Sequence, residues 1–130
     1  MPVSKTIVFT IGDMTFEYDE EKNKANIKKH GISFRSAARV FFDYDRIELY
    51  DEENSQEEAR YDTIGNISTV SGTIIGNVNR DVKHIDDILF VVYTERVHTI
   101  DNGKTIETTR LISARMATNF ERGLYYGKFD

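Results

Sequence analysis

Residues Ile88-Leu-Phe-Val-Val-Tyr-Thr94 form a continuous run of β-branched, aromatic and other apolar side chains, which is typical of a central β-strand. Further strands are predicted around it at residues 46–50, 58–64 and 108–114, and the turn signal Asn102-Gly103 precedes the last of them. Earlier in the chain, residues 6–11 and 14–18 alternate on either side of Gly12-Asp13, which predicts a β-hairpin. The chain is therefore expected to build an antiparallel β-sheet.

Two helices are predicted between the hairpin and the later strands. Asp19 is suited to cap a helix that runs to about His30, with Gly31 as its C-terminal stop and Ala25 marking its buried side. The second helix begins at the cap Ser33 and carries an apolar stripe at i, i+3, i+4 and i+7: Phe34, Ala37, Ala38 and Phe41.

The C-terminal segment Thr118-x-x-Glu121 is a capping box, which predicts one more short helix. The expected fold class is α+β, with an antiparallel β-sheet packed by two N-terminal helices and a short C-terminal helix. A chain of 130 residues has the size of one domain, so residues 1–130 are expected to form a single globular unit.

The composition argues against several classes of protein. The chain has no cysteine, and His30, His84 and His98 lack the paired spacing of a zinc motif, so no metal and no other cofactor is expected. No apolar segment approaches the roughly 18 residues that a membrane span requires, and the N-terminus lacks the apolar region of a secretion signal. We therefore expect a cytoplasmic protein with no membrane partner.

The formal net charge is −5, which argues against nucleic-acid binding over the whole surface. Much of the acidity lies in residues 43–58, where eight acidic side chains accompany a lone Arg46. Such a segment is either a solvated turn and strand edge whose charges discourage aggregation, or a docking surface for a basic partner. The sequence leaves both interpretations open.

Two separated blocks of sequence resemble one known family, BrnT. The first block contains Tyr18-Asp-x-x-Lys22, Asn26 and Lys29-His30-Gly31-x-Ser33-Phe34, and the second is Leu111-Ile-Ser-Ala-Arg115-x-Ala-Thr118-x-x-Glu121-Arg122. Between them, Arg60-Tyr61-x-x-Ile64-Gly65 and Val91-Val92-Tyr93-Thr94-Glu95-Arg96 resemble the middle segments of the family in the same order. Against the usual family core, the strand at about 6–11 looks like an N-terminal addition, and residues 66–87 look like an extended connection.

The resemblance implies a RelE-like fold and the toxin half of a bacterial type II toxin-antitoxin pair. Such a toxin is a metal-independent endoribonuclease that cleaves mRNA, inhibits translation and is neutralised by a cognate antitoxin of the BrnA type. Because the antitoxin carries the DNA-binding domain in this family, no direct DNA contact is expected from this chain. A homodimer within the complex stays an open alternative.

The resemblance also suggests site residues. Arg96 and Arg115 stand at family motif positions and suit phosphate binding, and they would lie close together if their strands pair through the turn at 101–104. The alternative is that these strand-end arginines form surface ion pairs, for example with Glu95 or Glu121. His30 is a candidate acid or base, or alternatively a cap of the preceding helix. Lys22 and Lys29 are candidate RNA-binding residues, and Tyr18 is either a base-stacking residue or a core aromatic.

Two departures from the family pattern favour a second hypothesis. Met116 stands where relatives carry lysine, and Phe120 lies in a stretch that is often basic in relatives. The alternative is therefore a catalytically weak or inactive BrnT-like interaction module that acts only within an antitoxin complex.

Overall fold

The computed structural model describes residues 4–68 and 87–127, and its largest element is a six-stranded sheet in the order β1-β2-β6-β5-β4-β3. The strands are β1 (Thr6–Ile11), β2 (Met14–Asp19), β3 (Ile47–Tyr50), β4 (Tyr61–Asn66), β5 (Ile88–Thr99) and β6 (Thr105–Met116). The helices are α1 (Glu20–His30), α2 (Phe34–Ala37), a 3₁₀ helix η1 (Ala38–Phe42) and α4 (Asn119–Gly127). The prediction of a mixed α+β fold is confirmed. The RelE likeness stays a prediction.

The prediction of a wholly antiparallel sheet is wrong at one junction. β2 pairs with β6 in parallel through Phe16–Thr109 and Glu17–Arg110, whereas all other neighbouring strands are antiparallel. Parallel neighbours cannot be joined by a tight turn. The chain between β2 and β6 contains α1, α2, η1 and the strands β3, β4 and β5, so β2 and β6 meet as distant segments.

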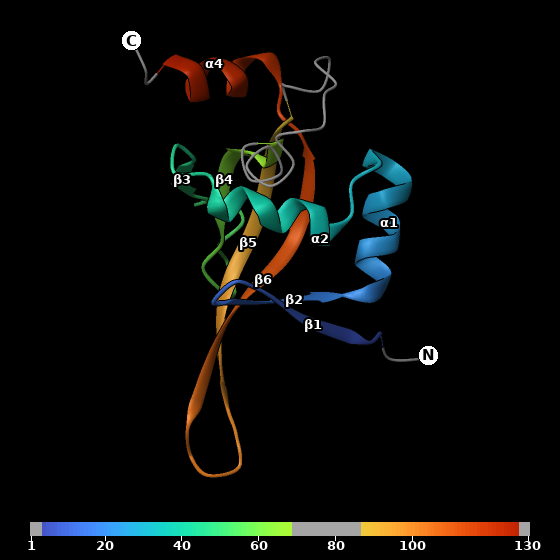
Figure 1. Ribbon diagram of the computed structural model, residues 1–130, viewed down its shortest axis with the longest axis vertical. Helices are drawn as coiled ribbons and strands as arrows, with labels where there is room; N and C mark the ends of the chain where they lie inside the picture. The colour runs from blue at the N-terminus through green and yellow to red at the C-terminus, as the bar shows by residue number, and fades with distance from the viewer. Residues whose placement is uncertain (1–3, 69–86, 128–130) are drawn as a thin grey trace.

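Helix α1 lies beside the sheet rather than across it, at the edge of β6 (Figure 1). Asp19 caps it by accepting a hydrogen bond from the Lys22 backbone N–H (3.0 Å), and Gly31 ends it at φ 73°. Its buried side is marked by Asn26, not by Ala25 as predicted. The side-chain amide of Asn26 donates to the Ala114 carbonyl (2.8 Å) and accepts from the Ala114 N–H (3.1 Å). It therefore satisfies backbone groups of β6 that have no neighbouring strand on that side.

The second predicted helix is shorter and tighter than expected, because only α2 is α-helical and η1 continues it as a 3₁₀ helix. Its apolar stripe nevertheless packs fully against the sheet, with Phe34, Ala37 and Ala38 completely buried. The approach to β4 is close: a Cβ on Gly65 would lie 2.9 Å from the Cβ of Val40. A glycine is therefore required where η1 crosses β4.

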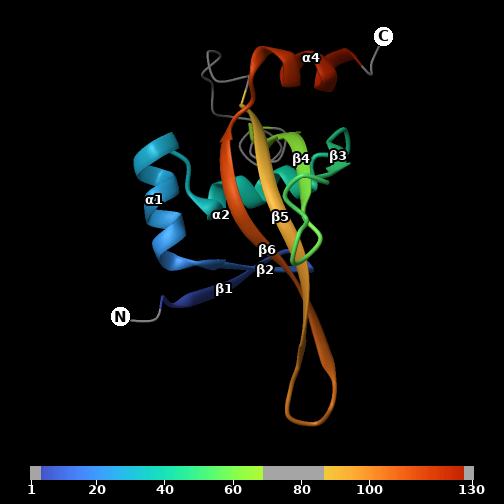
Figure 2. The same cartoon turned by 180° about the vertical axis from the view of Figure 1, so that it is seen from behind.

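The two faces of the sheet are covered differently, as the views from opposite sides show (Figures 1 and 2). The helix face carries α2 and η1 over the larger apolar core, which includes Phe16, Tyr18 and Phe41. The opposite face, here called the outer face, is covered at one end by α4, where Tyr125 packs on Ile64 and Ile88. The capping box predicted for α4 is present, with Glu121 N–H donating to Thr118 Oγ1 (3.2 Å).

At the other end of the sheet, the β5–β6 hairpin extends beyond its neighbours and turns through Gly103 at φ 84° (Figure 1). Most of the predicted extended segment 66–87 lies outside the described residues. No described helix has the length and hydrophobicity to span a membrane.

Candidate functional site

Period-two alternation places a group of polar side chains together on the outer face. Because Phe16 and Tyr18 of β2 point into the core, the side chain of Glu17 between them points to the opposite face. Its parallel neighbour Arg110 does the same, and β5 adds side chains at alternate positions. We call this group the outer-face cluster: Glu17, Glu58, Arg96, His98, Thr108 and Arg110.

Glu17 is the centre of this cluster, and its side chain is only 3% exposed. One carboxylate oxygen, Oε1, accepts a hydrogen bond from the Thr108 hydroxyl (2.7 Å) and lies 2.6 Å from His98 Nε2. The other, Oε2, accepts from Arg110 Nη1 (2.5 Å). Burial raises the pKa of this carboxyl, but the hydrogen bonds from Thr108, Arg110 and His98 together outweigh it and hold the pKa below its ordinary value. Glu17 is therefore a buried carboxylate whose partners are fixed.

Arg96 lies beside this centre and is more accessible, with 38% of its side chain exposed. Its Nη2 donates to both carboxylate oxygens of Glu58 (2.8 and 3.1 Å). The segment that carries Glu58 is held over β5 because the Thr94 hydroxyl donates to the backbone carbonyl of Ala59 (2.6 Å). The Arg96 guanidinium is thus held at the surface by Glu58, which lies on the segment docked over β5.

Further cations surround the Glu58 carboxylate. The hydrogen bond from Arg96 holds the pKa of Glu58 below its ordinary value, and the charges of Arg60 and Arg110 lower it further. The Nε atom of Arg60 is buried and has no hydrogen-bond partner in the described part of the chain. Three guanidinium groups therefore lie close to one exposed region of the outer face, an arrangement that suits an anionic group such as a phosphate.

Arg115 lies elsewhere, and the prediction that it would be close to Arg96 is wrong. The strands do pair through the predicted turn, but Arg115 is opposite Phe90 and Arg96 is opposite Thr108. Phe90 and Arg96 are six positions apart on β5, which amounts to about 20 Å along the strand.

The partners of Arg115 are those of a structural residue. It donates to both oxygens of Glu121 (2.8 and 2.9 Å), and its guanidinium carbon lies 4.2 Å from the centroid of the Phe90 ring. Glu121 also accepts a hydrogen bond from the Thr118 backbone N–H (2.9 Å) as part of the capping box. Arg115 therefore fastens α4 to the sheet.

The other predicted site residues are not brought to the outer-face cluster. Lys22 and Lys29 are exposed on α1, and His30 is half-buried at its C-terminal end, one turn beyond the Asn26 contact with Ala114. In residues 4–68 and 87–127, no ion pair or hydrogen bond joins their side chains to Arg96. The structure thus leaves their proposed roles without support from geometry.

Tyr18 is a core aromatic, so the alternative of base stacking is wrong. Its ring is 5% exposed and meets Phe34 (5.6 Å between centroids) and Phe9 (5.8 Å) edge to face. No face of the ring is left for a nucleobase.

A carboxyl pair, Asp51 and Asp62, lies farther along the outer face toward α4. Burial, followed by the hydrogen bond and charge of Asp51, raises the pKa of Asp62 to about 7. Arg115 lowers that pKa and Glu121 raises it, so the pair is within electrostatic reach of the Arg115 contact. Among the described residues, no group of three or more histidine, cysteine or acidic side chains is placed to hold a metal ion.

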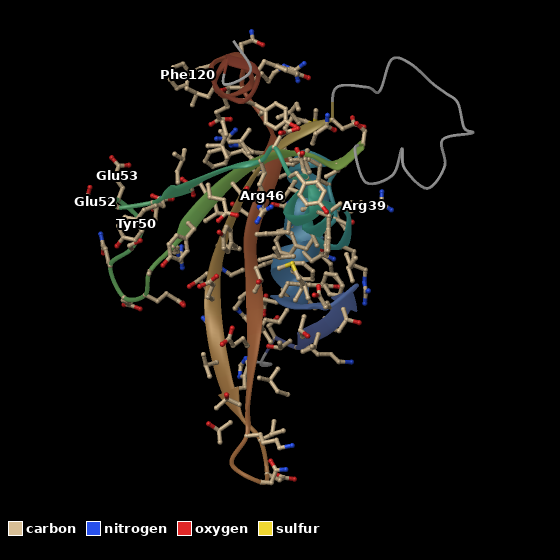
Figure 3. All side chains as sticks on the ribbon, turned by 60° about the vertical axis from the view of Figure 1, so that its left-hand side comes forward. Arg39, Arg46, Tyr50, Glu52, Glu53 and Phe120 are labelled. Atoms are coloured by element: carbon tan, nitrogen blue, oxygen red, sulfur yellow. The ribbon has the colours of Figure 1, made fainter. Side chains whose placement is uncertain are left out.

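The acidic segment 43–58 divides into structural and exposed carboxylates. Asp43 is buried, where it accepts hydrogen bonds from Tyr125 (2.6 Å) and the Asn66 backbone (2.8 Å). Figure 3 shows Glu52 and Glu53 at the free edge of the sheet, past β3 and away from Arg39. The exposed part of the acidity therefore lies at an edge strand.

Sequence reasoning missed Glu17 and His98, the pair at the centre of the cluster. The side chain of His98 is 47% exposed and contacts Glu17. The available signal was the alternation of β2, which places a glutamate between two core aromatics and so aims a carboxylate at the opposite face. The 81-residue separation from His98 concealed its partner.

Comparison with known proteins places most of the first half of the chain in a family. Residues 18–81 match the family model described as the ribonuclease toxin, BrnT, of type II toxin-antitoxin systems. The matched segment includes Lys22, His30, Glu58 and Arg60, whereas Glu17 and the β5–β6 residues of the cluster lie outside it. A search of curated proteins finds no match.

Proposed function

This chain belongs to the BrnT family of ribonuclease toxins of type II toxin-antitoxin systems, and on that premise we propose that it is a metal-independent endoribonuclease that cleaves mRNA. Cleavage of mRNA inhibits translation, and a cognate antitoxin of the BrnA type neutralises the chain by covering the site. The protein acts in the cytoplasm, and the antitoxin rather than this chain contacts DNA. A homodimer within the complex is compatible with this function.

The observation that supports the proposal is the position of Arg96 beside Arg110 on the outer face. Cleavage of RNA without a metal requires cations that neutralise charge developing on the phosphate. Arginine suits this task because its planar guanidinium stays charged and matches two phosphate oxygens. Arg96 is exposed enough to meet a phosphate, and the Glu17 carboxylate fixes the orientation of Arg110.

The roles first predicted for Arg115 and His30 are revised in this proposal. Arg115 holds α4, and His30 lies at the end of α1, so we assign neither of them to the reacting phosphate. Lys22 and Lys29 remain proposed RNA contacts for parts of the strand away from the scissile phosphate, because both are exposed and positively charged.

The test measures RNA cleavage and growth with the same chain. Induction without an antitoxin should arrest growth and shorten mRNA, and the purified protein should cleave RNA in the presence of EDTA. Co-expression of the cognate antitoxin should restore growth. Intact mRNA and normal growth despite soluble, folded protein would reject the toxin, and cleavage that EDTA abolishes would reject metal independence.

One observation favours the alternative of a non-catalytic interaction module. Phe120 of α4 is 75% exposed, and Leu124 is exposed one turn later, so this helix presents apolar side chains to solvent (Figure 3). On this alternative, Phe120→Ser should weaken antitoxin binding while RNA remains uncleaved by the wild-type chain. RNA cleavage by the purified wild-type chain excludes the alternative.

A further inference from the structure

We propose that His98 is the catalytic base of this protein, and that Glu17 is the positioning residue that holds His98 toward the RNA. The inference rests on the proposed ribonuclease function and names residues of the same site. It is carried by the hydrogen-bonded cluster on the outer face, in which a buried carboxylate contacts one exposed imidazole and one fixed guanidinium.

The partners of Glu17 determine the tautomer of His98. Glu17 Oε1 already accepts the Thr108 hydroxyl, and Oε2 accepts Arg110, so the carboxylate acts only as an acceptor. His98 Nε2, 2.6 Å from Oε1, must therefore carry the hydrogen in this contact. In the neutral imidazole, Nδ1 then has a free lone pair, which is the state that a general base needs.

The position of His98 relative to Arg96 fits a phosphate and an adjacent ribose. The two residues are two positions apart on β5, so their side chains lie on the same face with Cα atoms about 7 Å apart. Both are partly exposed, 38% for Arg96 and 47% for His98, whereas Glu17 is not. A phosphate on Arg96 places the neighbouring 2′-hydroxyl within reach of the imidazole.

The reaction that follows is a transesterification. The 2′-oxygen attacks the adjacent phosphorus, the O2′–P bond forms, and the 2′-hydroxyl proton passes to His98 Nδ1. The P–O5′ bond breaks, and the leaving 5′-oxygen takes a proton from water. The hydroxide that remains takes the proton from His98 and so regenerates the base. The products are a 2′,3′-cyclic phosphate and a 5′-hydroxyl end, while Arg96 and Arg110 neutralise the charge on the phosphate oxygens.

Glu17 acts through two contacts at once. Its charge stabilises the imidazolium that forms when His98 takes the proton, and its hydrogen bonds keep Arg110 and His98 in fixed orientations. The groups that face His98 are Glu17 from β2, Thr108 and Arg110 from β6, and Arg96 from β5. β1 and Glu17 precede the segment that matches the family model.

The first experiment compares His98→Gln with Thr99→Gln in the full chain. Both variants place the same amide on the hairpin, but residue 99 points to the other face. Because a general base contributes about 10²- to 10⁴-fold, we expect His98→Gln to lower kcat by about 100-fold or more and Thr99→Gln to leave it unchanged. The acid limb of the pH–rate profile should disappear with His98→Gln, and added imidazole should restore cleavage by His98→Ala.

The second experiment tests Glu17 through Glu17→Gln, with Glu107→Gln on the other face of the hairpin as its control. A positioning role predicts a fall in kcat with a smaller change in KM and an altered pH–rate profile. Circular dichroism and a thermal melt show whether the buried substitution folds. If it does not, the exposed His98 variants decide the proposal.

The outcomes separate this inference from the proposed function. Absence of RNA cleavage by the wild-type chain overturns both. Cleavage that Arg96→Ala abolishes but His98→Gln leaves at the wild-type rate and pH profile overturns the assignment of His98 and leaves the ribonuclease function intact.

Discussion

Arg96 and Arg115 project from the same face of the same pair of strands, yet their surroundings differ. Arg115 is held by both oxygens of Glu121, stacks on Phe90 and joins α4 to the sheet. Arg96 donates to Glu58 through one nitrogen, Nη2, and its guanidinium lies among other cations. A bidentate pair that also caps a helix is a structural contact, whereas a partly exposed guanidinium beside further cations is suited to meet an anion.

The difference shows that the residue type at a motif position does not fix its role. An arginine with two satisfied hydrogen bonds and a ring beneath it must lose these contacts before it binds a phosphate. Arg96 exchanges one partly exposed carboxylate, that of Glu58, for one phosphate, which costs less free energy. The Arg96 end is therefore assigned to chemistry and the Arg115 end to stability.

The largest effect is expected from Arg96→Ala, with a loss of RNA cleavage of about 100-fold or more because one guanidinium that neutralises the phosphate is removed. Arg96→Lys should recover part of the rate, since charge returns without the bidentate geometry. Stability should change little because this ion pair is partly exposed. Single-turnover cleavage and thermal melts measure the two quantities. A wild-type rate in the alanine variant would place the reacting phosphate elsewhere.

Arg115→Ala should give the opposite pattern. It leaves Glu121, whose side chain is only 14% exposed, without its main partner and removes the contact with Phe90. We therefore expect a loss of about 2 kcal/mol in the free energy of unfolding. Cleavage by the folded variant should stay within a few-fold of wild type. Urea unfolding measures the free energy of unfolding, and a cleavage assay on the folded variant measures the rate. A stable variant that has lost its activity would return Arg115 to the catalytic site.

A smaller effect is expected at Asp62, which lies between the two arginine ends. A carboxyl whose pKa is raised from 3.8 to about 7 by burial and by Asp51 favours the folded chain while it is protonated. That stabilisation is complete below pH 3.8 and is lost as the pH rises through 7. Asp62→Asn should remove this dependence. Because solvent screens this partly exposed group, we expect a change of only about 1 kcal/mol: the free energy of unfolding of the variant, relative to that of the wild type, should be about 1 kcal/mol higher at pH 8 than at pH 5. Equal pH dependence of unfolding in both chains would show that Asp62 titrates normally.

Local signals in the sequence predicted the elements well, because caps, turns and alternation are properties of neighbouring residues. Asp19, Gly31 and the Thr118 box act as predicted. The parallel junction of β2 with β6 and the burial of Asn26 depend on segments that lie far apart in the chain, and no local pattern encodes them.

The same limit applied to the candidate site. Arg96 was found as a motif position, but its distance from Arg115 follows from the register of β5 with β6, which a turn signal alone does not set. The partners of Glu17 come from two other strands. The sequence therefore showed candidate residues on a single strand, but not the contacts between residues of different strands.

The smallest expected effect concerns Met116 at the end of β6. Met116 is opposite Leu89 on the helix face, whereas the adjacent Arg115 points to the outer face, so a lysine at 116 would project away from Arg96. The side chain lies among Ile27, Ile32 and Leu89, where the methylene stem of a lysine fits with its amine in water. Met116→Lys should therefore leave both the cleavage rate and the unfolding free energy close to wild type.

RNA affinity measured at several salt concentrations distinguishes the two ends of the sheet. Each added phosphate contact on single-stranded RNA steepens the dependence of log affinity on log salt by about 0.7. If the RNA is bound around Arg96 alone, the slope for Met116→Lys equals that of the wild-type chain, and Arg96→Ala reduces it. A slope steeper by about 0.7 in the lysine variant would extend the RNA path to the Arg115 end and toward the lysines of α1. Weakened antitoxin binding with an unchanged slope would instead assign Met116 to the protein interface, because a lysine amine desolvated there is costly.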